Sequence, residues 1–369
     1  MTRKNIAAGA KHSLILEENG VVWSCGCNNR GQLGLGDQES RVAFQKIEQL
    51  PPVVSVACGS THSAALDESG NAWIFGYGGT NEDGGIRVME VPQQVPNLPI
   101  ISQIACGLLH TLFLDLEGCI WSMGNNYYGQ LGIGNSNRVG WVTIRVENLP
   151  KISAIYCGGN HSVAIDENNF VYCTGDNSYD QLGLKNVDAY NKLFVQFTQI
   201  QNFPDVKEAA CGEYHTIFLK NDGTVWCAGK NSTGQLGLNT LRPKVEPSRN
   251  DFLPPISAIA SGNEYTIFVD HTGSVWYCGQ LPSQRWSAEP VIITSLSAIV
   301  ECAAGHTHSL FVDGKQNCWV LGENKDGQVG IKNTLLKKNK VLGPTKLKIV
   351  KVMPPFLQNA NNTKSARSL

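Results

Sequence analysis

The chain has 369 residues and a formal net charge of −1 at pH 7, from 30 Lys and Arg against 31 Asp and Glu. A nearly neutral chain carries no global charge that attracts nucleic acid or anionic lipid, so we expect no nucleic-acid partner. No apolar run is long enough to span a bilayer and residues 1–4 do not form a secretory signal, so we expect a cytosolic protein.

One phrase recurs seven times along the chain, and its third copy joins Gly107-Leu108-Leu109-His110 to Gly118, Trp121 and Gly129-Gln130-Leu131-Gly132. The anchor residue of the seven copies is His12, His62, His110, His161, His215, Tyr265 and His308. These anchors are 50, 48, 51, 54, 50 and 43 residues apart. A period near fifty with short apolar alternations is typical of a propeller blade. No single repeat can bury its own apolar face, so we expect one closed domain.

Each repeat is predicted to form four β-strands, because apolar and small residues alternate between turn residues. In the third repeat these strands are predicted at residues 100–106, 110–115, 119–123 and 141–146. The glycine before the third strand, such as Gly118, lies where a hairpin needs a positive φ. The chain is therefore predicted to be all-β, a seven-bladed β-propeller of four-stranded antiparallel blades over residues 1–355. The polar tail, residues 356–369, is predicted to be disordered.

The strand order predicts how the ring closes. Blade one starts near the N-terminus and blade seven ends near Pro355, so neither terminus lends a strand to the other end. Closure is therefore expected to depend on packing between blades one and seven.

Twelve cysteines raise the question of disulfides. Cys58, Cys106, Cys157 and Cys211 occupy the same position in four repeats. Equivalent positions on a ring belong to different blades, which we expect to be too far apart for a bridge. Reduced thiols in the cytosol are the simpler interpretation.

The repeated histidines and acids suggest two kinds of chemistry that we do not favour. The Cys-x-x-x-His spacing, as in Cys106 and His110, could bind a metal, but a ring spreads such ligands apart. We expect no metal and instead a buried histidine that bonds to the backbone at each turn. Acids at the turn between second and third strands, such as Asp166 and Asp222, are explained by a solvated hairpin tip rather than by catalysis. No phosphate-binding Gly-x-x-x-x-Gly-Lys motif occurs, so no catalytic residue and no cofactor are predicted.

Lysines concentrate near the C-terminus. They are Lys337, Lys338, Lys340, Lys346, Lys348 and Lys351. Such residues can protect an edge strand, or they can contact an acidic partner or an anionic membrane. The sequence leaves these alternatives open.

The repeated tokens Gly-x-x-His-Ser/Thr, Gly-x-Val-Trp and Gly-Gln-Leu-Gly resemble the regulator-of-chromosome-condensation repeat family of seven-bladed propellers, over about residues 5–355. Its members include an exchange factor for the small GTPase Ran, a plant ultraviolet receptor, and modules of ubiquitin ligases and cilia proteins. The receptor's Gly-Trp-Arg-His-Thr motif does not occur here. Six of the eight tryptophans fill the repeat position, which leaves Trp141 and Trp286. The family has several functions, so the fold alone does not give the function.

The second repeat departs from the pattern after Gly76, where a Gly-rich stretch replaces the Gly-Gln-Leu-Gly turn. This stretch resembles the β-wedge of the Ran exchange factor. The resemblance implies a GTPase-binding wedge made of Gly79, Thr80, Asn81, Glu82, Asp83, Gly84, Gly85, Ile86 and Arg87. Glycines would allow close backbone approach, the polar residues would occupy the tip, and Ile86 and Val88 would anchor the hairpin to the propeller. The alternative is a degenerate repeat with a variable loop.

The resemblance implies guanine-nucleotide exchange, or at least activation, on a Ran-type small GTPase, without covalent chemistry. Its docking face would include Ser60, Leu109 and Tyr214. Ser60 and Leu109 are not acidic, whereas the exchange factor has acids at the matching positions, and that factor's basic N-terminal arm is missing. Some intracellular bacteria deliver proteins of this family into the host cytosol to act on the Ran cycle, which the Asn- and Lys-rich composition would fit. The competing hypothesis is a non-catalytic interaction scaffold, and in either case we expect a monomer.

Overall fold

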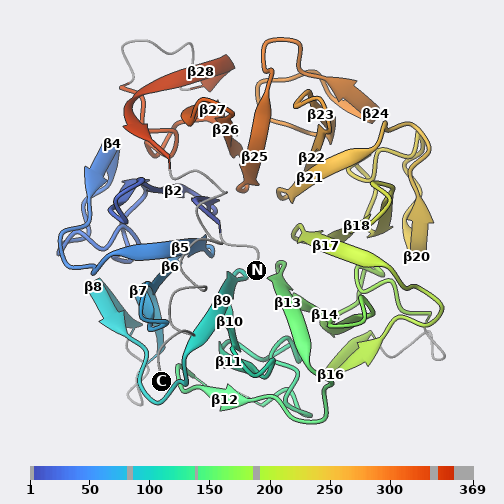
Figure 1. Cartoon of the computed structure of the whole chain (residues 1–369), viewed down its shortest axis with the longest axis horizontal. Coiled ribbons are helices and arrows are strands. Elements are labelled where there is room, and N and C mark those ends of the chain that lie inside the picture. The colour runs from blue at the N-terminus through green and yellow to red at the C-terminus, as the bar shows by residue number, and fades with distance from the viewer. Residues whose placement is uncertain (1–3, 81–85, 138–139, 186–191, 333–339, 353–369) are drawn as a thin grey trace, which may run out of the picture.

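Each repeat forms one antiparallel sheet of four strands in chain order, and the seven blades form a ring (Figure 1). The first strands of all seven blades line a cavity of about 180 Å³, which we call the central channel. The computed structural model describes residues 4–80, 86–137, 140–185, 192–332 and 340–352. The strands of blades one to three are β1 (Ile6–Ala8), β2 (His12–Leu16), β3 (Val22–Gly26), β4 (Arg41–Lys46), β5 (Val53–Cys58), β6 (His62–Asp67), β7 (Ala72–Thr80), β8 (Ile86–Gln94), β9 (Ile101–Cys106), β10 (His110–Asp115), β11 (Ile120–Gly124) and β12 (Ile144–Arg145). Those of blades four to seven are β13 (Ile152–Cys157), β14 (His161–Asp166), β15 (Val171–Asp176), β16 (Leu193–Gln199), β17 (Val206–Cys211), β18 (His215–Lys220), β19 (Val225–Gly229), β20 (Lys244–Arg249), β21 (Ile256–Ser261), β22 (Tyr265–Asp270), β23 (Val275–Gly279), β24 (Ser287–Ile292), β25 (Ile299–Ala304), β26 (His308–Asp313), β27 (Asn317–Glu323) and β28 (Lys340–Lys351). The predicted fold class is confirmed.

The second strand of each blade is buried along nearly its whole length, as in β10 and β14, because both faces of its sheet pack against neighbouring blades. Outer strands such as β4 are largely exposed. The apolar residues gather into clusters between adjacent blades; between blades four and five, Val163 and Ile165 meet Val206 and Phe218. The core is therefore distributed around the ring, and no blade could bury its apolar residues alone.

The ring closes without a strand borrowed from the other terminus among the described strands, as predicted. Glu301 of β25 accepts hydrogen bonds from the backbone N–H and the side-chain amide of Asn5, at 2.8 and 3.0 Å. The backbone N–H of His306 also donates to the carbonyl of Gly9, and Glu17 forms a single β-bridge with Val352. Closure therefore combines packing with polar contacts between blades one and seven.

The third blade differs from the prediction in its outer strand. The expected strand at residues 141–146 is reduced to Ile144–Arg145, and Trp141 lies outside it. The reason is that Trp141 packs into the core between blades two and three. The turn glycine of this blade is as predicted, since Gly118 has a φ of 83°.

Three expectations concern the C-terminal tail, the cysteines and membrane-spanning segments. Residues 353–369, which include the predicted tail, lie outside the described residues, so the boundary at 355 stays a prediction. All twelve cysteines are free, as expected. Within the described ranges no helix has the length and apolarity needed to cross a membrane.

Candidate functional site

The hairpin of blade two is longer than its counterparts. In blades one, five and six the ladder between third and fourth strands ends at a glycine, with pairs such as Gly26 with Arg41. In blade two the matching pair is Gly76 with Met89, and the ladder continues through Tyr77 with Val88 and Thr80 with Ile86. We call residues 77–80 and 86–88 the hairpin stem. Blades four and seven continue by one pair only, so among the described ladders this extension is the longest.

The structure places four of the predicted wedge residues in the stem. Gly79 and Thr80 end β7, and Ile86 and Arg87 begin β8. The other five, Asn81, Glu82, Asp83, Gly84 and Gly85, lie outside the described residues.

One prediction about the stem is wrong. Ile86 does not anchor it to the propeller, since 47% of the side chain is exposed. The residue that contacts the stem is Trp141, which sequence reasoning missed. Its ring centre lies 6.3 Å from that of Tyr77. The available signal was that Trp141 is one of two tryptophans outside the repeat position.

The stem begins on the face of the ring that carries the Gly-x-x-His turns, which we call the turn face. The backbone N–H of Tyr77 donates to the carbonyl of Thr61 in the blade-two turn, at 2.8 Å. Ser60, Leu109 and Tyr214 lie in the turns of blades two, three and five on this face, and each is half-buried. The three predicted docking residues therefore share one face of the ring: Ser60 lies in the blade of the hairpin, Leu109 in the next blade and Tyr214 three blades away.

An aromatic and charged cluster stands on the turn face over blades four to six. The rings of Tyr179 and Tyr214 lie 4.9 Å apart, and Tyr179 is 46% exposed. The Nζ atom of Lys230 lies 5.5 Å from the Tyr214 ring centre and 2.8 Å from Glu264. Burial, and next a hydrogen bond with Glu213, raise the pKa of Tyr214 to about 12. An exposed tyrosine packed on a half-buried one beside a paired cation is typical of a protein-binding surface.

The repeated histidines link neighbouring blades. Each ring Nε2 atom lies 2.8–3.0 Å from a hydroxyl on the next blade, and the sequence prediction of a backbone partner is wrong. The pairs are His12–Ser63, His62–Thr111, His110–Ser162, His161–Thr216, His215–Thr266 and His308–Ser13. In blade six the hydroxyl of Tyr265 lies 3.0 Å from that of Ser309 and takes the same place. The Nε2 atom of each imidazole faces the next blade, while its Cε1–Nδ1 edge packs against the glycine of its own turn, where a Cβ atom on Gly107 would overlap the ring of His110.

The hydrogen bonds that the hydroxyls donate show which imidazole nitrogen carries the proton. Ser63 donates its hydrogen to the carbonyl of Gln32 at 2.9 Å, so its oxygen accepts from Nε2–H of His12. Burial lowers the pKa of His12 to about 3 and that of His62 to about 4, so these rings are neutral near pH 7. No group of three or more His, Cys, Asp or Glu that could hold a metal occurs among the described residues. The histidines serve the structure of the ring.

The acids at the turns between second and third strands also have structural roles. Asp67 is only 5% exposed, and it accepts from the Trp73 indole at 2.9 Å and from the backbone N–H groups of Ser69 and Asn71. Asp115, Asp270 and Asp313 bind their tryptophans in the same way. The expected solvated tip is therefore wrong for Asp67, Asp166 and Asp270, whose carboxylates turn inward to hold the hairpin, whereas Asp222 is exposed as expected.

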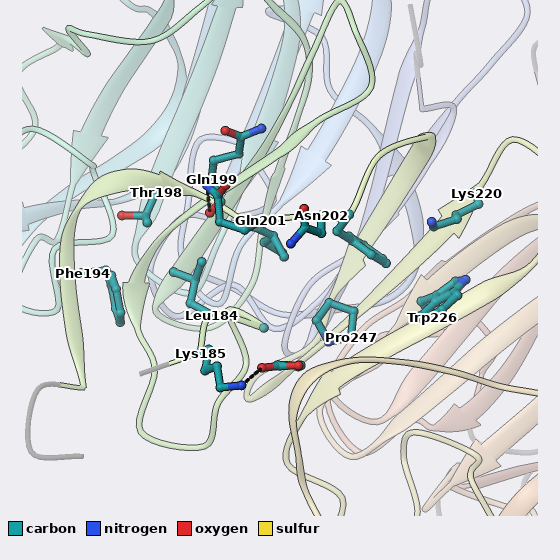
Figure 2. A pocket seen from close by; sticks show the side chains of 14 residues that line it. Leu184, Lys185, Phe194, Thr198, Gln199, Gln201, Asn202, Lys220, Trp226 and Pro247 are labelled. Carbon is teal, nitrogen blue, oxygen red and sulfur yellow. Dashed lines mark hydrogen bonds and ion pairs between the residues drawn. The ribbon is translucent and has the colours of Figure 1, made fainter. Parts of the chain in front are cut away.

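A groove of about 730 Å³ runs along the outer edge between blades four and five (Figure 2). Its apolar lining includes Leu184, Phe203 and Trp226. The Nζ atom of Lys220 lies 4.7 Å from the Phe203 ring centre and 5.0 Å from that of Trp226. On the other side of the groove Lys185 pairs with Glu246 at 3.3 Å. Nothing in the sequence pattern pointed to this groove.

The lysine cluster near the C-terminus remains largely untested. Lys337 and Lys338 lie outside the described residues, and of the others Lys346 is exposed.

The closed ring of seven blades, linked by six histidines and one tyrosine, defines a class of propeller, and comparison with known proteins places the chain within it. The sequence profile of the RCC1-like domain matches residues 2–285. The chain therefore belongs to the RCC1-like domain family. This confirms the resemblance that the repeated motifs indicated.

Curated relatives of this chain have different functions. The chain is 33% identical over 253 residues to the human probable E3 ubiquitin-protein ligase HERC6, covering 65% of this chain and 25% of the ligase. It is 34% identical over 258 residues to the dog X-linked retinitis pigmentosa GTPase regulator, covering 68% and 25%. It is 29% identical over 244 residues to the ultraviolet-B receptor UVR8 of Arabidopsis thaliana, covering 64% and 54%. The chain thus spans about a quarter of the first two relatives and about half of the third.

Solved structures show the same architecture. Prp20p of Saccharomyces cerevisiae superposes with a TM-score of 0.73 and 25% identity over 83% of this chain and 81% of that one, and its structure was described with its binding to Gsp1p and histones. Human WBSCR16 superposes with a TM-score of 0.76 and 20% identity over 89% and 93%, which shows the fold alone.

Proposed function

We propose that this protein is a guanine-nucleotide exchange factor or activator for a Ran-type small GTPase. The extended stem of blade two carries the proposal, because its strand ladder continues on the turn face past the point where most other described ladders end. Two similar proteins are linked by name to GTPases: Prp20p was studied for binding to Gsp1p, and one curated relative is a GTPase regulator.

The proposed mechanism needs no covalent step. A GTPase holds its nucleotide through phosphate contacts and Mg²⁺. A protein that binds the nucleotide-free GTPase more tightly than the loaded form weakens nucleotide binding by the same factor, because the two equilibria are linked. The stem presents the exposed Ile86 and Arg87, and the segment 81–85 that they flank would press on the phosphate-binding loop.

The turn face would supply the remaining affinity. Tyr179, Tyr214 and Lys230 provide rigid aromatic area beside a cation whose charge Glu264 already balances. Such surfaces bind through a few buried aromatic contacts rather than through net charge. Ser60 and Leu109 line the part of the face next to the hairpin and offer no acid, so we expect contacts there to be apolar or made by the backbone.

We also propose a cytosolic setting, which includes the host cytosol if the protein is a delivered bacterial effector. Twelve free cysteines support a reducing compartment.

The direct test is release of a fluorescent guanine nucleotide from a Ran-type GTPase, with and without this protein. We expect micromolar protein to accelerate release by at least about tenfold, within the range of typical coupling energies. A variant in which residues 81–85 are replaced by Asn-Gly should lose the acceleration. That turn can close the hairpin because Thr80 pairs with Ile86.

Glu246→Ala in the outer groove is the matched control and should keep full activity, since it lies on another part of the ring. Equal release rates with and without the wild-type protein would rule the proposal out. Unchanged activity of the Asn-Gly variant would instead remove the hairpin from the mechanism.

A second candidate is a non-catalytic interaction scaffold, and the groove of Figure 2 is the observation that favours it. An extended segment with aromatic and acidic side chains would suit its Phe203 and Trp226 lining and the Lys220 amino group. If release is not accelerated, loss of partner binding in Trp226→Ala would support this function.

A further inference from the structure

Blade two lacks an apolar residue that six other blades provide. In those blades the connection between third and fourth strands inserts one apolar side chain that is at most 1% exposed. These residues are Leu33, Leu131, Leu182, Leu236, Leu281 and Val329. Where the core clusters include them, they pack between their own blade and the next, as Leu182 does between blades four and five. The connection of blade two is the hairpin itself, which leaves the interface with blade three without this residue.

Trp141, which belongs to blade three, packs into the interface between blades two and three. It comes from the connection between β11 and β12 of blade three and packs on the cluster that contains Met89, Phe113 and Met123. Its ring also stands edge-on to the buried His62, with centres 5.2 Å apart and planes at 79°. A residue from blade three thus completes a core that blade two does not.

The same indole contacts the hairpin stem. Its ring meets that of Tyr77 at 81°. A Cβ atom on Gly79 would overlap the Cδ1 and Nε1 atoms of Trp141. Gly79 also has a φ of 88°, which side chains other than hydrogen rarely tolerate. The stem therefore approaches the indole so closely that only glycine fits between them.

We propose that Trp141 is a positioning residue that sets the direction of the blade-two hairpin relative to the turn face. Because the indole is held in the interface with blade three, its contacts with Tyr77 and Gly79 fix the stem to two blades rather than one. The consequence for nucleotide exchange rests on the proposed function, whereas the anchoring itself does not.

The anchoring is tested first without any GTPase, by hydrogen exchange on peptides that cover 77–80 and 86–88. In Trp141→Ala we expect these amides to exchange about tenfold faster or more. In the wild-type protein the stem must lose its packing against the indole before it can open, and the variant has no such packing to lose. Trp141→Phe should restore most of the protection. Trp276→Ala is the matched control: its indole is bound to Asp270 at the opposite end of blade six, so it should leave the stem unchanged.

Nucleotide release then measures the effect on function. Trp141→Ala should lower the maximal rate of nucleotide release by about tenfold or more, with little change in the half-saturating protein concentration. A misplaced hairpin reduces the release rate strongly, whereas the turn face still binds the GTPase. Tyr214→Ala, a change in the docking surface, should show the reverse pattern.

The outcomes separate the two proposals. Wild-type protein that accelerates no release would refute the proposed function, while faster exchange of the stem in Trp141→Ala would still support the anchor. Unchanged exchange of the stem in Trp141→Ala, in a variant that melts as a folded protein, would overturn the anchor. If Trp141→Ala does not fold, Gly79→Ala gives the same test from the other side of the contact, with the same expected result.

Discussion

At the scale of single residues, the buried histidines join neighbouring blades and make the stability of the ring sensitive to acid. His110 and His215 are neutral and donate to hydroxyls that themselves donate to backbone carbonyls on the preceding connection, and burial lowers the pKa of both histidines to about 3. In the unfolded chain the same groups have a pKa near 6.5. The unfolded state therefore binds more protons than the folded state between these values, and stability falls as the pH drops through that window.

We predict that the urea midpoint falls sharply between pH 7.5 and 5.5. Each ring histidine should remove about 1 kcal/mol over this interval, where carboxylates scarcely titrate. Equilibrium unfolding at the two pH values measures the change. His215→Gln, which keeps a donor for Thr266, should reduce the difference by about 1 kcal/mol. A midpoint that is the same at both pH values would show that the histidines are not held neutral.

At the scale of the strand pair, a turn carboxylate accepts from the tryptophan indole of the following strand in five of the seven blades. Burial alone would raise the pKa of Asp67, but hydrogen bonds from Trp73, Asn71 and the turn backbone outweigh it and lower the pKa. The charged form is thus favoured in the folded state, and its contribution is lost as the pH falls below the ordinary value of an aspartate.

We predict that Asp67→Ala destabilises the protein by about 2 kcal/mol, because it leaves the indole N–H and turn N–H groups without their acceptor. The neighbouring Glu68→Ala should change stability by less than about 0.5 kcal/mol, since that side chain is exposed. Urea unfolding at pH 7 compares them, and equal effects of the two changes would contradict the role of Asp67.

The strands also show what sequence reasoning can reach. Repetition made the seven blades predictable, because a period near fifty constrains every copy at once. The segments that depart from the repeat were harder to predict. The missing Gly-Gln-Leu-Gly turn predicted the long hairpin of blade two, but nothing predicted its contact with Trp141. That contact joins residues of two blades whose sequence spacing follows no repeat. The inter-blade partner of each histidine was missed for a similar reason, since Ser63 lies one whole repeat beyond His12.

At the scale of the whole molecule, closure of the ring depends on the half-buried Glu301. Glu301 accepts from two N–H groups of Asn5 and from that of Ile6, and burial raises its pKa despite the nearby Lys4. Lys4 itself reaches across the channel to Glu208 at 3.1 Å, so the first described residues tie blade one to blades five and seven.

We predict that Glu301→Ala destabilises the ring by about 2 kcal/mol, because three donors lose their acceptor in a half-buried site. Glu246→Ala, an exposed acid that also pairs with a lysine, should have little effect. Thermal unfolding of both variants is the measurement, and a melting temperature of Glu301→Ala equal to that of the wild type would show that packing alone closes the ring.

The most direct test of the central claim is the affinity of the whole protein for a Ran-type GTPase in two states. An exchange factor must bind the nucleotide-free GTPase more tightly than the GDP-loaded form, and we predict a difference of about 100-fold or more by calorimetry or surface binding. The Asn-Gly hairpin variant should bind the two forms nearly equally. Equal affinity of the wild-type protein for both forms, or no binding to either, would contradict the account.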